Sequence, residues 1–173
     1  MTRINAVPGE GPEDAKIMLI GEAPGKKEDE TGRPFIGRAG ALLGRALNEA
    51  SLSREEVFIT NVVKCRPPDN RKPKAKEIKA CRTYLLEQID IVRPSIIVTL
   101  GLTALQSFKD TKRMQESSFE WVYRDKKIKI FPTYHPAAAL RGSKLAKHSL
   151  FRTMKEVKRF MKQQNHHIDE NSL

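Results

Sequence analysis

Short apolar runs alternate with amphipathic stretches along most of this chain. The runs have the length and composition of buried strands and fall at residues 16–20, 57–61, 95–100 and 129–132. Apolar residues at helical spacing occupy residues 39–50 and 76–92 between these runs, and residues 144–161 after the last one. Strands that alternate with helices predict a parallel sheet covered on both faces, and therefore an α/β protein.

Length and composition agree with one globular domain spanning residues 1–173. The 39% hydrophobic share is enough for a core, and no internal repeat or long linker divides the chain. The polar last ten or so residues are expected to be disordered. No apolar run approaches the roughly 20 residues that cross a bilayer, so no membrane span is expected. Two cysteines and an early acidic N-terminus without a signal-peptide core predict a cytoplasmic protein.

Positive charge is concentrated in two segments of the chain, whose formal net charge is +11. Eight basic residues accompany two acidic ones between Lys64 and Arg82, and eight accompany one acidic residue between Ala139 and Lys162. Basic runs are commonly solvated helix faces. Two such segments on an otherwise near-neutral chain also suit a surface that follows phosphates, so nucleic acid is a candidate partner.

Three chemically capable residues follow the ends of different predicted strands, where open parallel sheets bind their ligands. Glu22 follows the first strand; it could polarise a water or stabilise a cationic sugar, or be a solvated turn residue. Asn61 ends the second strand; it could read the edge of a base or simply form a turn. His135 follows the fourth strand; it could hydrogen-bond a developing anion or be structural.

A phenylalanine in a glycine-rich loop is a further candidate. Phe35 could plug the edge of the core or stack on a flat ligand, a contact that contributes roughly 1–3 kcal/mol for a base. The chain has neither a Walker phosphate loop nor a GxGxxG turn, which argues against nucleotide triphosphatases and dinucleotide enzymes.

Several ordered motifs strongly resemble those of the family 4 uracil-DNA glycosylases. They run from about residue 9 to residue 141 and are GEAPG at 21–25, GRPFIG at 32–37, ITNVVKCRPP at 59–68 and PTYHP at 132–136. The resemblance implies a three-layer α/β/α sandwich with a central four-stranded parallel sheet. It also implies an enzyme that hydrolyses the N-glycosidic bond of uracil in DNA and leaves an abasic site, the first step of base excision repair.

The resemblance assigns a role to each candidate residue. Glu22 would act on the water or on the sugar cation, and His135 would contact the uracil carbonyl oxygen as the base leaves as an anion. Phe35 would stack on the extruded uracil and Asn61 would read its polar edge. Together with these two, Gly21 and Gly25 would bind the substrate.

A base inside a duplex cannot reach such a pocket, so the nucleotide must be flipped out at a cost of a few kcal/mol. The expected partner is uracil-containing DNA, single- or double-stranded, with a monomeric protein. Arg66, Arg71 and Lys144 are expected to contact the DNA backbone. Leu140 and Arg141 resemble the loop that fills the gap in the stack, although Leu140 could instead merely cap a helix.

The chain departs from the family in its cysteines. Family 4 members usually hold a [4Fe–4S] cluster with four cysteines, of which only the later two have counterparts here, Cys65 and Cys81. Either an earlier pair is missing from this sequence or the chain is a variant without the cluster. We expect no metal and no cofactor, with the [4Fe–4S] cluster as the alternative.

Two other functions remain open at this point. The chain could be a non-catalytic DNA-binding member of the same fold, or a glycosylase of broader range that also accepts hypoxanthine or xanthine. A related branch crosslinks to its product through a histidine in a basic loop. No histidine lies between Pro68 and Cys81, so ordinary turnover is expected.

Overall fold

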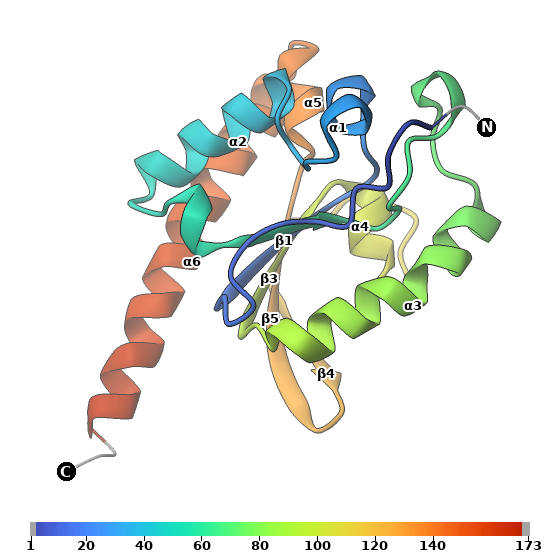
Figure 1. Ribbon diagram of the computed structural model, residues 1–173. Helices are drawn as coiled ribbons and strands as arrows, with labels where there is room; N and C mark the ends of the chain where they lie inside the picture. Colours follow the sequence, from blue (N-terminus) through green and yellow to red (C-terminus); the bar gives the residue numbers. More distant parts are fainter. Residues whose placement is uncertain (1–2, 171–173) are drawn as a thin grey trace.

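The computed structural model describes residues 3–170 and contains a five-stranded sheet with helices on both faces (Figure 1). The strands are β1 (Ile17–Gly21), β2 (Phe58–Asn61), β3 (Ile96–Leu100), β4 (Phe119–Tyr123) and β5 (Lys126–Thr133). The helices are α1 (Lys26–Thr31), α2 (Arg38–Glu49), α3 (Ala75–Val92), α4 (Leu102–Gln106), α5 (Pro136–Leu140) and α6 (Lys144–Glu170), with 3-10 turns η1 (Arg54–Glu56) and η2 (Pro68–Asn70).

The strand order is β2-β1-β3-β5-β4, and the sheet is mixed. β2, β1, β3 and β5 run parallel, whereas β4 pairs antiparallel with β5. The prediction of a four-stranded parallel sheet is therefore wrong by one strand. β4 joins β5 through Arg124 and Asp125, both with positive φ (47° and 63°), which is the geometry of a two-residue hairpin turn.

Two apolar cores cover the two faces of the sheet. One core packs α2 and α6 on residues such as Leu19, Val98 and Phe131. The other packs α3 and α4 on the opposite face, against Met18 and Ile97. The side chains of β1 and β3 are buried throughout because both faces are covered, which explains their unbroken apolar runs. The protein is a three-layer α/β/α sandwich, with α2 and α6 on one side and α3 on the other (Figure 1).

Helix α6 is longer than its apolar pattern predicts. It continues through residues expected to be disordered as far as Glu170, while residues 171–173 lie outside the described part of the chain. Twenty-seven residues give a helix about 40 Å long, which runs from the α5 end of the molecule past the far end of the sheet (Figure 1). None of the helices between residues 3 and 170 is long and apolar enough to cross a membrane.

The four parallel strands end at one edge of the sheet. The segments that follow these ends, including α1, α5 and the loop before α3, gather above that edge (Figure 1). Gly21 and Asn61 are the last residues of β1 and β2, and the other candidate residues of the active site belong to these segments or to the loop between α1 and α2.

Candidate active site

A cavity of about 220 Å³ opens at the carboxyl ends of the strands. Phe35, Asn61 and His135 line it, although they come from three distant parts of the chain, and Gly25 and Glu28 lie beside them. The remaining lining residues are small or peripheral, namely Ala23, Gly37, Arg38, Ala39, Gly40 and Ala137. The cavity is smaller than those that hold drug-sized ligands, which suits a single small ring.

Gly21, the last residue of β1, lies next to the side chains of Phe35 and Asn61. A Cβ atom at this position would stand 2.5 Å from the Phe35 ring and 2.5 Å from Asn61 Oδ1. Because these distances are far below van der Waals contact, only glycine allows both side chains to occupy their places. Gly21 therefore shapes the site by lacking a side chain, and it is not itself among the residues that line the cavity.

Phe35 is held close to His135 in an unusual backbone conformation. Its φ is +47°, in the left-handed region that bulky residues rarely adopt, and the side chain is buried. Its ring centroid lies 5.6 Å from that of His135, with 30° between the ring planes. A Cβ atom on Gly40 would stand 1.8 Å from the Phe35 carbonyl oxygen, so α2 can pass this loop only because residue 40 is glycine.

The amide of Asn61 is buried and incompletely satisfied. Only 1% of the residue is exposed, and Oδ1 has no hydrogen-bond partner within the described residues. Such an atom is costly to bury, so its presence on a cavity wall points to a ligand that supplies a donor. An amide can accept one hydrogen bond and donate another to the same ligand edge.

His135 is arranged to be a neutral donor. It caps α5, and its Nδ1 accepts a hydrogen bond of 3.0 Å from the backbone N–H of Ala137. Burial lowers the pKa of His135 to about 4, because the nearby charge of Glu22 offsets the loss of hydration only in part. At neutral pH the ring is therefore uncharged with its proton on Nε2, which can donate to an anion.

The carboxylate of Glu22 is oriented by a residue that the sequence analysis missed. Its Oε2 accepts a hydrogen bond of 2.6 Å from the hydroxyl of Thr103, which is buried in α4. Glu22 does not itself line the cavity but stands close enough to influence the pKa of His135. The sequence did hold a signal for Thr103, namely its position three residues after the end of β3, where open parallel sheets place their functional residues.

Lys64 contradicts its assignment to a phosphate-binding segment. It is only 6% exposed, and its Nζ donates to the Asn61 carbonyl oxygen at 2.6 Å, to Thr60 Oγ1 at 2.8 Å and to Gln88 Oε1 at 2.8 Å. Burial lowers the pKa of Lys64 to about 7. Lys64 thus supports the backbone that carries Asn61 instead of facing solvent.

The other expected DNA contacts are placed unequally. Leu140 is 38% exposed at the end of α5, and Arg141 and Lys144 are exposed immediately after it. Arg66 donates to Asn70 Oδ1 at 2.7 Å, and Arg71 forms an ion pair with Glu77 at 2.7 Å. The two arginines are therefore already engaged, Arg66 within its own loop and Arg71 with the first turn of α3. DNA contact by any of the five side chains stays a prediction.

The two cysteines face a common space away from the candidate active site. Cys65 and Cys81 both line a cavity of about 400 Å³, and Cys65 Sγ accepts a hydrogen bond of 3.1 Å from Arg3. Within residues 3–170, no group of three or more His, Cys, Asp or Glu side chains could hold a metal ion. Two thiols are half of the four ligands that a [4Fe–4S] cluster requires, so these residues alone do not fit that cluster.

Comparison with known proteins agrees with this geometry. The family model of the uracil DNA glycosylase superfamily matches residues 8–159. A type-4 uracil-DNA glycosylase of Sulfurisphaera tokodaii is 52% identical over 154 residues, covering 84% of this chain and 70% of the relative. The type-4 enzyme of Saccharolobus solfataricus is 52% identical over 90% of this chain and 77% of its own length. The type-4 enzyme of Thermotoga maritima is 43% identical over 95% of this chain and 87% of its own length. Because the family model covers most of the sequence and these relatives are 43–52% identical over most of it, the chain belongs to the uracil DNA glycosylase superfamily.

Proposed function

We propose that this protein is a uracil-DNA glycosylase that hydrolyses the bond between uracil and deoxyribose and starts base excision repair. The observation that carries the proposal is the unpartnered amide oxygen of Asn61 on the wall of a small cavity that also contains Phe35 and a neutral His135. The relatives named type-4 uracil-DNA glycosylase support the same substrate.

Recognition of uracil follows from the free hydrogen-bonding groups of Asn61. Its Oδ1 accepts from the ring N3–H of uracil and its Nδ2 donates to the neighbouring carbonyl oxygen. Cytosine presents an acceptor at N3 and an amino donor next to it, so both contacts would become repulsive. Phe35 stacks on the flat face of the ring, a contact available to any base and therefore one of affinity.

Bond cleavage requires charge stabilisation on both sides of the glycosidic bond. The C1′–N1 bond breaks with its electron pair on uracil, and the neutral imidazole of His135 donates from Nε2 to the carbonyl oxygen where that charge gathers. The carboxylate of Glu22, oriented by Thr103, stabilises the cationic sugar and accepts a proton from the water whose oxygen bonds to C1′. Uracil takes a proton from solvent, and an abasic site remains.

The target nucleotide reaches this cavity by leaving the stack, which costs a few kcal/mol. Leu140 would enter the vacated space, with Arg141 and Lys144 on the flanking phosphates, because these three exposed side chains follow His135 directly. We further propose that the protein acts as a monomer in the cytoplasm.

The reaction described above uses only side chains of this chain, and we propose that it needs no cofactor. The support is that this sequence brings two thiols, Cys65 and Cys81, to one cavity where a [4Fe–4S] cluster needs four. Iron analysis and visible absorbance of the purified protein test this proposal. Stoichiometric iron with a charge-transfer band would overturn it.

The function is tested with a uracil-containing oligonucleotide, single- or double-stranded, followed by alkaline cleavage of abasic sites. Strands treated with wild-type protein should be cleaved at uracil by the alkali, whereas Asn61→Ala and Glu22→Gln should lower the rate of uracil excision about 100-fold or more. Absence of cleavage above the background of these variants would leave a DNA-binding protein without turnover. Competing oligonucleotides with hypoxanthine or xanthine would reveal a broader range.

A further inference from the structure

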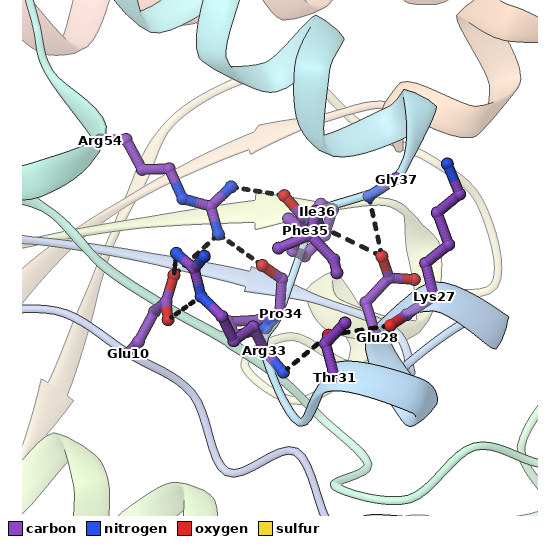
Figure 2. Close-up of polar contacts among 10 residues, drawn as sticks. All are labelled: Glu10, Lys27, Glu28, Thr31, Arg33, Pro34, Phe35, Ile36, Gly37 and Arg54. Atoms are coloured by element: carbon purple, nitrogen blue, oxygen red, sulfur yellow. Dashed lines mark hydrogen bonds and ion pairs between the residues drawn. The ribbon is translucent and has the colours of Figure 1, made fainter.

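Charged side chains from other parts of the chain contact the loop that carries Phe35, and neither the sequence motifs nor the reaction steps give them a role. Phe35 needs its left-handed backbone conformation in order to face the cavity, and bulky side chains resist that conformation. Contacts around the loop must therefore stabilise it. Figure 2 shows that charged side chains approach this loop from two sides.

On the carbonyl side, Arg54 binds two consecutive backbone oxygens. Its Nη1 donates to the carbonyl oxygen of Phe35 and its Nη2 to that of Pro34 (Figure 2). Arg54 belongs to η1, just before β2, and 24% of its side chain is exposed. Because the guanidinium is a planar fork, it can reach both oxygens and still bind a third acceptor, which a lysine cannot do.

On the amide side, Glu28 accepts two consecutive backbone N–H groups. Its Oε2 is 3.2 Å from the nitrogen of Ile36 and 3.0 Å from that of Gly37 (Figure 2). Its Oε1 is 3.0 Å from the nitrogen of Gly25. Arg54 thus holds the carbonyl oxygens of the peptide groups on both sides of Phe35, and Glu28 holds the N–H groups of the two peptides that follow Phe35. Glu28 also lines the substrate cavity, so it does not separate a positioning role from direct contact.

Arg54 has a third contact that connects the loop to strand β2. Its Nη2 lies 3.1 Å from Glu10 Oε1, and Glu10 pairs through its backbone with Ile59, at 3.0 Å and 2.8 Å. Strand β2 ends two residues later at Asn61. Arg54 and Glu10 therefore join the stacking residue to the strand that carries the reading residue, without lining the cavity themselves.

We propose that Arg54, held by Glu10, is a positioning residue that fixes the Phe35 ring over the base, and so sets the affinity of the site for its target base. This proposal rests on the proposed glycosylase function. Arg54 touches neither substrate nor reacting atoms, so its loss should weaken binding and largely spare the chemical step.

Arg33 provides the matched control. It binds the same carboxylate, with its Nε 3.0 Å and its Nη2 2.9 Å from Glu10, but it contacts no carbonyl oxygen of the loop and its side chain is 60% exposed. A variant at residue 33 removes the same charge and one partner of Glu10. A difference between the two variants therefore reports on the contacts of Arg54 with residues 34 and 35.

The first experiment measures steady-state excision from a uracil-containing oligonucleotide and inhibition by free uracil. Arg54→Ala should raise KM and the inhibition constant of uracil about tenfold with kcat changed less than threefold, whereas Arg33→Ala should change each less than twofold. In a Phe35→Ala background, Arg54→Ala should have little further effect on KM. Equal effects of both arginine variants, or an undiminished effect in that background, would overturn the proposal.

The second experiment does not depend on activity. Hydrogen exchange of the segment 33–40 should be faster in Arg54→Ala than in wild type or Arg33→Ala, while exchange in β1 and β3 stays unchanged. If wild-type protein failed to excise uracil, the proposed function would be wrong, but this measurement would still test whether Arg54 holds the loop. Unchanged exchange of the segment 33–40 in Arg54→Ala would refute the positioning role of Arg54, even if the enzyme were active.

Discussion

The two basic segments look equivalent in the sequence and are used differently in the structure. In the segment 64–82, Lys64 is buried, Arg66 binds Asn70 and Arg71 is paired with Glu77. In the segment 139–162, Arg141 and Lys144 are exposed directly after His135. Several charged groups of the first segment are bound by other residues of the protein, whereas the first two charges of the second segment are exposed to solvent. Net charge in a sequence window therefore does not measure the charge available for binding.

The second segment is itself not uniform. Lys162 lies 18 residues beyond Lys144 on α6, about 27 Å along the helix axis and away from the cavity edge. Arg152 is paired with Glu116 at 2.5 Å. We therefore expect only the start of this segment to reach phosphates next to a flipped nucleotide.

The largest expected difference between the two segments is in protein stability, when Lys64 or Lys144 is replaced. Lys64→Met should lower the free energy of unfolding by about 2–4 kcal/mol, because the Asn61 carbonyl and Gln88 lose a buried donor. It should also slow uracil excision at least tenfold by loosening Asn61. Lys144→Met should leave the free energy of unfolding within about 0.5 kcal/mol of wild type. Urea unfolding and single-turnover excision measure both effects, and equal losses of stability would abolish the distinction.

The next largest effect concerns the salt dependence of DNA binding. If Arg141 and Lys144 each contact a phosphate, removing either should reduce the slope of log K against log salt by about 0.9 for duplex DNA, whereas Lys162→Ala should leave it unchanged. Anisotropy titrations at several salt concentrations give the slopes. A slope that falls with Lys162→Ala as much as with Lys144→Ala would mean that α6 binds DNA along its whole length.

The pH dependence of stability separates the same two lysines. The folded protein holds Lys64 with a pKa of about 7, well below the 10.5 of a solvated lysine. Between these values the unfolded chain binds more protons, so the free energy of unfolding should rise with pH by up to about 1.4 kcal/mol per unit. The difference between wild type and Lys64→Met should show this slope between pH 7 and 10, and the difference between wild type and Lys144→Met should be flat. A flat Lys64 difference would mean that the amine is solvated.

The smallest effect is expected at Arg71, whose charge is bound by Glu77. Burial plays little part there, and the Arg71 hydrogen bond lowers the pKa of Glu77 to about 2. Arg71→Ala should change the free energy of unfolding by about 0–1 kcal/mol, because ion pairs that stay in partial contact with solvent contribute little. It should also change the salt slope less than Lys144→Ala does. A larger loss of slope at Arg71 would show that the loop releases this arginine to DNA.

The sequence predicted that Asn61 and His135 lie at the carboxyl ends of the parallel strands, because strand ends can be located from apolar runs, and it singled out Phe35 from its glycine-rich loop. It missed the edge strand β4, in which the half-buried aromatic residues at 119, 121 and 123 alternate with the exposed Glu120 and Val122. The signal was the aromatic and β-branched composition before a polar two-residue turn. That Phe35, Asn61 and His135 act on uracil stays a prediction.

The residues that orient the site could not be found from local patterns. Lys64 is buried by contacts with Gln88, 24 residues away, and Glu22 is oriented by Thr103, 81 residues away. Arg54 binds carbonyl oxygens that any residue would present at positions 34 and 35. Such contacts depend on the packing of whole layers, and they leave no spacing rule in the sequence.

Substitutions at Gly21 can only disturb the site and cannot widen it. Residue 21 already lacks a side chain, so no substitution there can enlarge the space for a bulkier base. A single methyl group there must displace Phe35 or Asn61, the side chains that come within 2.5 Å of it. Attempts to redesign this enzyme for larger lesions therefore have to move a strand or change the opposite wall, because the sheet itself sets the depth of the pocket.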